Sequence, residues 1–194
     1  MTAEAFRFRG GRLCLDFAAT LGAQYRDPIE RLATPADLVR WVELAIPGSD
    51  AAVARASAMP DGAVLAAAHE LRAAIRRLVH PATGENPQAA DIVIVNDWAA
   101  RPGFASVLGP DARSAWLDAG KPAEAGLAVV AGDAIDLLSG PWRSRVRECG
   151  RPDCSLLFLD KSRQGQRRWC DMESCGNLMK ARRYRQAHRT GAAG

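Results

Sequence analysis

Residues 149–175 decide the fold of the C-terminal part of this chain, and they read CGRPDCSLLFLDKSRQGQRRWCDMESC. The stretch holds two cysteine pairs, Cys149 with Cys154 and Cys170 with Cys175, with four residues inside each pair and fifteen between the pairs. Two pairs separated by enough chain for a hairpin are typical of a structural zinc site, because four soft thiolates give zinc a closed tetrahedral shell. We therefore predict that these four cysteines hold one structural zinc ion.

The ligand types favour a structural site over a catalytic one. A catalytic zinc leaves one position open for water and usually has histidine or carboxylate ligands, yet the nearest histidine, His188, lies thirteen residues beyond Cys175. An iron–sulfur cluster and thiols unrelated to a metal are the alternatives that the spacing leaves open. The N-terminus lacks the apolar run of a signal peptide, so we expect a cytoplasmic protein, and clustered thiols in that reducing compartment are more often metal ligands than disulfides.

Positive charge is concentrated around these cysteines. Residues 141–194 contain 13 lysines and arginines against 5 aspartates and glutamates, a net charge of +8, whereas residues 1–140 carry a net charge of −4. Zinc with four thiolates contributes a charge of −2, so about +6 remains on the C-terminal part. A surplus of this size favours a polyanionic partner, and duplex DNA is our first hypothesis.

The cationic side chains lie on two predicted segments. Residues 155–160 predict a strand, residues 161–169 predict a basic turn that enters a second strand, and residues 176–187 predict a helix. Arginine predominates, and its planar guanidinium suits phosphate oxygens and guanine edges. Trp169 and Tyr184 are expected either to stack on a base or to cover the small core of this part. The candidate nucleic-acid contacts are Arg163, Arg167, Arg168, Lys180, Arg182, Arg183, Arg185 and Arg189.

The same residues allow other partners besides DNA. A solvated terminal helix, or a zinc-stabilised module that binds an acidic protein or structured RNA, is the alternative. We expect no enzyme and name no catalytic residue, because the C-terminal part has neither a phosphate-cradling glycine loop nor a carboxylate or histidine cluster with catalytic spacing. No stretch has the roughly 18 apolar residues of a membrane helix. A single basic finger seldom gives enough specificity alone, so we expect a homodimer, and a small-molecule effector is a further candidate partner.

The rest of the chain predicts a mainly α-helical protein with small β elements. A length of 194 residues with 48% hydrophobic residues suits one medium domain plus a small module, and excludes a large multidomain enzyme and a disordered chain. Ser139-Gly140-Pro141 divides a helical domain, 1–140, from a four-cysteine zinc module, 141–194, built as a hairpin followed by a basic helix. Patterning and end signals predict a strand, turn and buried segment over 6–22, helices over 34–46, 61–80, 89–100 and 122–138, and a hairpin over 104–118.

Short motifs in both parts resemble two domains that occur together. Phe158-Leu159-Asp160, Arg167-Arg168-Trp169-Cys170 and Cys175-Gly176-Asn177-Leu178 are similar to the CGNR zinc finger. The N-terminal part resembles the ABATE domain through GGRLCLDF at 10–17, TLG at 20–22 and ATPADL at 33–38. The resemblance implies a bacterial, stress-related transcription regulator whose finger binds DNA.

Two residues depart from these motifs. Leu178 stands where the finger has the arginine of Cys-Gly-Asn-Arg, and Ala19 stands where the body motif usually has asparagine before Thr20. If the missing arginine contacts DNA, this chain binds DNA more weakly or differently. If it pairs with a carboxylate such as Asp160, Leu178 only changes the packing of the module.

Overall fold

Five of the six helices that the structure describes in the N-terminal part of the molecule, which we call the body (residues 6–140), pack together. The computed structural model describes residues 6–56, 58–81 and 87–190. Helix α6 packs against the other four body helices and is buried along most of its length. A Cβ at Gly126 of α6 would come within 2.6 Å of Val42, so α2 and α6 approach closely. The helices are α1 (Leu13–Ala18), α2 (Pro35–Ala45), α4 (Gly62–Val79), α5 (Ala89–Ala99) and α6 (Pro122–Ser139).

Local end signals explain where α2 and α4 begin. Thr34 and Asp37 form a capping box at the start of α2, with Pro35 in the first turn. Asp61 accepts a hydrogen bond from the Val64 amide (Oδ1–N 3.0 Å) and caps α4. The helices predicted at 34–46, 61–80, 89–100 and 122–138 are thereby confirmed within one or two residues at their ends.

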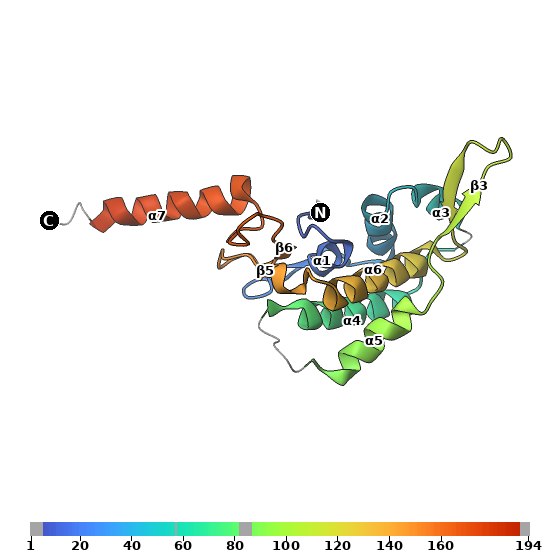
Figure 1. Cartoon of the computed structure of the whole chain (residues 1–194), viewed down its shortest axis with the longest axis horizontal. Coiled ribbons are helices and arrows are strands. Elements are labelled where there is room, and N and C mark those ends of the chain that lie inside the picture. The colour runs from blue at the N-terminus through green and yellow to red at the C-terminus, as the bar shows by residue number, and fades with distance from the viewer. Residues whose placement is uncertain (1–5, 57, 82–86, 191–194) are drawn as a thin grey trace.

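The strands of the body are short and belong to two-stranded antiparallel sheets. β1 (Leu21–Gly22) pairs with β2 (Ile29–Glu30), and β3 (Ala105–Leu108) pairs with β4 (Ala115–Asp118), which confirms the predicted hairpin. The short helix α3 (Asp50–Arg55) contacts β4. At the end of the molecule opposite the C-terminus, β3 and β4 project from the helices (Figure 1).

The strand predicted near the N-terminus is wrong. Residues 6–9 have no regular structure, and the buried segment that follows them is the helix α1. The backbone is held instead by specific bonds: the Gly10 amide donates to Asp16 Oδ1 (2.7 Å), and the Gly10 carbonyl accepts from the Leu159 amide (2.8 Å). Asp16 and Leu159 bond to Gly10 without pairing it into a strand. The alternation of apolar and basic residues over 6–9 therefore does not produce a strand here.

The C-terminal part, which we call the zinc module (residues 141–190), is a hairpin followed by a basic helix. β5 (Val146–Glu148) pairs with β6 (Leu157–Leu159), and the first cysteine pair lies in the turn between these strands. Residues 160–169 contain no strand, so the second strand predicted after the basic turn is wrong. A π-helical turn (Met172–Gly176) leads into α7 (Asn177–Thr190), which extends away from the body as one end of the molecule (Figure 1).

Body and zinc module share one hydrophobic core. Val146, Leu157 and Leu159 of the hairpin are at most 3% exposed and belong to the same buried cluster as the apolar side chains of α1, α2, α4 and α6. In the other direction, Ala19 of the body packs among the cysteines and Phe158. The hairpin is therefore fixed to the helices by packing on both of its faces, while α7 extends beyond them.

Candidate zinc centre and nucleic-acid interface

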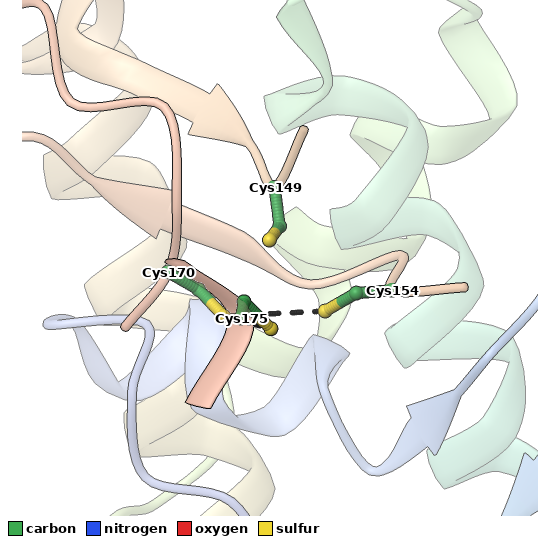
Figure 2. A group of neighbouring side chains, drawn as sticks. All are labelled: Cys149, Cys154, Cys170 and Cys175. Carbon is green, nitrogen blue, oxygen red and sulfur yellow. Dashed lines mark hydrogen bonds between the residues drawn. The ribbon is translucent and has the colours of Figure 1, made fainter. Parts of the chain in front are cut away.

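The four cysteines converge on one point. Their Sγ atoms all lie within 4.8 Å of one another, and the four side chains are buried. Figure 2 shows the sulfur atoms turned towards a common centre from the hairpin turn, the following loop and the π-helical turn. Cys170 Sγ lies 3.6 Å from Cys175 Sγ and 3.9 Å from Cys154 Sγ. Tetrahedral zinc with bonds of about 2.3 Å needs sulfurs about 3.8 Å apart, so the group suits one zinc ion.

The electrostatics of the group also suit a divalent cation. Hydrogen bonds from Cys154 and Cys170 lower the pKa of the Cys149 thiol, and the hydrogen bond to Cys149 raises the pKa of Cys170 far above its ordinary value. Crowded thiols thus resist becoming four thiolates unless positive charge lies among them. Zinc supplies that charge, and the Arg151 guanidinium adds to it, since its Nη1 lies 3.7 Å from Cys175 Sγ.

Aromatic and carboxylate side chains fix the loop that joins the cysteine pairs. Trp169 packs on the cysteine cluster, and its ring lies so near Gly150 and Gly176 that a Cβ at either would come within 3.2 Å of it. Asp160 is fully buried and accepts from the Ser162 and Arg167 amides (2.9 and 2.8 Å). Burial opposes ionisation, yet these hydrogen bonds lower the pKa of Asp160. Trp169 therefore covers the small core of the module, which is one of the two roles predicted for it; the other was stacking on a base.

Ion pairs between described residues attach the module to the body at three places, one of which is the pair of Arg26 with Asp153 in the first cysteine turn (3.2 Å). Glu148 of β5 accepts hydrogen bonds from Arg76 of α4 (3.0 Å) and from Tyr25 (2.6 Å). On the other side, Arg9 pairs with Asp171 beside the π-helical turn (2.5 Å). Sequence reasoning missed this interface, because its partners are far apart in the chain and each resembles an ordinary surface charge.

Six of the predicted nucleic-acid contacts are exposed cations of the zinc module, and one of them, Arg167, also holds its loop together. Lys180, Arg183 and Arg185 lie on α7, and Arg163 and Arg168 lie on residues 161–168, which we call the finger loop. Arg168 lies over the Trp169 ring, with its Cζ 5.4 Å from the ring centroid. The zinc fold thus brings two basic segments of the sequence into one small module.

Three of the eight predicted contacts differ from the other five. Arg167 donates to the carbonyls of Trp169 (2.8 Å) and Cys170 and lies over the Phe158 ring, so it holds the loop together. Arg182 donates to Asp153 Oδ2 (2.8 Å) and ties the base of α7 to the first cysteine turn. Arg189 lies in α7, but its side chain falls outside the part of the chain that the structure describes.

The second aromatic candidate is placed differently from Trp169. Tyr184 is 65% exposed on α7, and its ring lies over His188 with 3.9 Å between the ring centroids. One face of the Tyr184 ring therefore contacts a neighbour on the same helix. Tyr184 plays no part in the packing of the cysteine cluster.

Comparison with known families agrees with both halves of this description. Residues 11–141 match the ABATE family, described as "Putative stress-induced transcription regulator". The chain belongs to the ABATE family. Residues 145–188 of this ABATE protein match the CGNR zinc finger. Neither description names an enzyme. Among curated proteins, none is similar enough to count as a match.

The two departures from the family motifs lie close to the zinc module. Leu178 is half-buried at the start of α7, and both carboxylate oxygens of Asp160 already accept backbone hydrogen bonds. Ala19, 6% exposed, lies in the cysteine cluster. Ala19 therefore contributes to the packing of the module, and the effect of Leu178 in place of the arginine stays a prediction. Separately, no helix among residues 6–56, 58–81 and 87–190 is long and apolar enough to cross a membrane.

Proposed function

We propose that this ABATE protein is a cytoplasmic transcription regulator that binds duplex DNA through α7 and the finger loop, without catalysing a reaction. Cys149, Cys154, Cys170 and Cys175 are its zinc ligands, and the zinc sets the angle at which α7 leaves the hairpin. The helical body supports the finger. Dimerisation stays a prediction.

One observation carries this proposal: α7 is a basic helix that projects from the rest of the molecule (Figure 1). Its principal contacts are with the adjoining π-helical turn, and Lys180, Arg183 and Arg185 are exposed along it. Most helices in proteins are stabilised by packing an apolar face, and the exposed residues of α7 offer no such face. A helix of this kind is expected to bind a partner through its charged side chains.

The shape of the element favours duplex DNA over duplex RNA. A lone α-helix fits the major groove of B-form DNA, which is about 12 Å wide. The major groove of A-form RNA is deep and too narrow for side chains to read. Arg163 and Arg168 of the finger loop, which is joined to α7 through the same cysteine cluster, are the candidates for phosphate contacts beside the groove.

The test is the binding of the zinc-loaded chain to a fluorescent random-sequence DNA duplex across a salt series. We expect the logarithm of affinity to fall linearly with the logarithm of salt concentration, with a slope of about −0.9 for each phosphate contacted. Structured RNA and polyglutamate should compete poorly, and zinc-stripped protein should bind weakly. Absence of DNA binding at low salt, or equal competition by polyglutamate, contradicts the proposal and favours a protein-binding module.

A further inference from the structure

A pocket of about 370 Å³ lies at the junction of body and zinc module. One wall comes from the segment around β1 and β2, including Leu21 and Ile29, and the opposite wall comes from the first cysteine turn, including Cys154 and Leu156. Its volume is within the range of small-molecule sites. We call it the junction pocket.

The charges of the junction pocket are predominantly positive. Four arginines line it, Arg7, Arg26 and Arg31 from the body and Arg151 from the zinc module, against two aspartates, Asp27 and Asp153. Arg31 is only 6% exposed, and its Nη1 donates to the Ala19 carbonyl (3.4 Å). A cation this deeply buried beside a pocket raises the electrostatic potential inside it, because water screens it poorly.

The local backbone is built around the Arg31 guanidinium. Gly22 of β1 lies against it so closely that a Cβ at this position would collide with the guanidinium group. Glycine at position 22, the last residue of the TLG motif, therefore leaves room for the Arg31 guanidinium. Across the pocket, Arg151 Nε is buried and donates to no acceptor among the described residues, the Asp153 carboxylate lying 4.0 Å away.

We propose that the junction pocket binds a small organic anion. A carboxylate or phosphate head group satisfies guanidinium donors, which bind such groups through paired hydrogen bonds. The apolar side chains of Leu21, Ile29 and Leu156 suit a compact apolar remainder. A fully polar ion such as inorganic phosphate would leave that apolar wall uncovered, so an aromatic or branched organic acid fits better.

The pocket is connected to α7 through one carboxylate. Asp153 pairs with Arg26 of the body (3.2 Å) and accepts from Arg182 of α7 (2.8 Å). An anion that draws Arg26 away from Asp153 leaves Asp153 to Arg182 and Arg151, and so changes how firmly the base of α7 is held. This coupling rests on the proposed function, since its effect is a change in DNA affinity. Anion binding by the pocket is independent of the proposed function.

The test uses isothermal titration calorimetry of the zinc-loaded full chain with benzoate and phenyl phosphate, and with neutral benzamide as the control ligand. We expect both anions to bind and benzamide not to bind. Arg26→Gln, an exposed position, and Gly22→Ala, which displaces Arg31, should each weaken anion binding at least about tenfold. Arg40→Gln on the exposed face of α2, outside the pocket, is the matched control and should bind as the wild type does.

Two arms of the experiment separate the possible failures. If neither anion binds at about 10 mM, or Arg26→Gln and Gly22→Ala bind them as tightly as wild type, the pocket proposal is overturned. DNA affinity is then compared with and without benzoate at constant ionic strength, where a change of about threefold or more supports the coupling. Anion binding without any change in DNA affinity overturns the coupling alone. DNA binding that is absent in every condition overturns the proposed function and leaves the pocket result standing.

Discussion

Arg76 of α4 donates to Glu148 of β5 across the boundary between body and zinc module, with 3.0 Å between Nη2 and Oε1. The Arg76 side chain is 12% exposed and that of Glu148 25%, so water screens the pair only in part. A second bond from Arg76 Nη1 to the Ser155 carbonyl (2.7 Å) fixes the turn beyond β5. One arginine of the body thus holds both ends of the first cysteine turn.

Replacing Glu148 should destabilise the whole chain. Glu148→Gln keeps the shape of the side chain but removes its charge, so Arg76 loses a charge-assisted hydrogen bond in a partly buried setting. We expect the free energy of unfolding to fall by about 1–3 kcal/mol in urea titrations of zinc-loaded protein.

An exposed pair provides the control for that experiment. Lys121 lies 3.6 Å from Glu124, and its side chain is 80% exposed. Lys121→Gln should therefore change the free energy of unfolding by less than about 0.5 kcal/mol. Equal effects of Glu148→Gln and Lys121→Gln would show that the Arg76–Glu148 pair adds no more to stability than an exposed ion pair does.

Loss of one cysteine ligand should affect the body as well as the zinc module. Cys170→Ser removes a thiolate, so the purified variant should contain less than one zinc per chain and melt at a lower temperature. Because Val146, Leu157 and Leu159 belong to the body core, we expect one cooperative transition for the whole chain.

The fifth cysteine supplies a matched comparison for zinc content. Cys14 is buried in α1, away from the metal-binding group. Cys14→Ala should lower stability by loss of packing but retain one zinc per chain. Two separate melting transitions in Cys170→Ser, with the body unchanged, would contradict the shared core.

Asp16 should make stability depend on pH. Burial raises its pKa from 3.8 to about 6, although its carboxylate accepts the Gly10 amide. A raised folded-state pKa means that the protonated form is favoured in the fold, so this contribution to stability is full below about pH 4 and is lost as the pH rises through 6.

The isosteric variant tests that sign. Asp16→Asn keeps an oxygen for the Gly10 amide and has no charge to desolvate. Its advantage over wild type in free energy of unfolding should grow from pH 5 to pH 7 and reach about 1–2 kcal/mol, allowing for the part of the side chain that water reaches. A constant difference across this range would show that Asp16 does not titrate there.

Local signals explain what could be predicted from the sequence. The cysteine spacing and the caps at Thr34 and Asp61 act over a few residues, and the structure confirms the sulfur cluster and both helix starts. Residues 92–95 favour a strand by propensity, yet they form a helix because Val95 and Trp98 share its buried face and Asp91 pairs with Arg77 (2.6 Å).

Long-range contacts explain what could not be predicted. Arg76 and Glu148 are 72 residues apart, and no pattern in the sequence pairs them. Arg167 and Arg182 resemble the other cations of the basic tail in sequence, but the fold commits Arg167 to backbone carbonyls and Arg182 to Asp153. Which arginines make structural hydrogen bonds depends on the tertiary structure, and this is why the predicted set of eight contacts divides.

The most direct test of DNA binding by α7 compares two double variants on a random-sequence duplex. In Arg183→Gln/Arg185→Gln, both substitutions lie on exposed positions of α7, and in Arg40→Gln/Arg113→Gln they lie on exposed positions of the body, so both variants lose the same charge. We predict that the α7 variant binds about tenfold more weakly and that its salt slope is shallower by about 1.8, while the body variant binds as wild type does. Unchanged affinity and slope in the α7 variant, or an equal loss in both variants, would contradict the account.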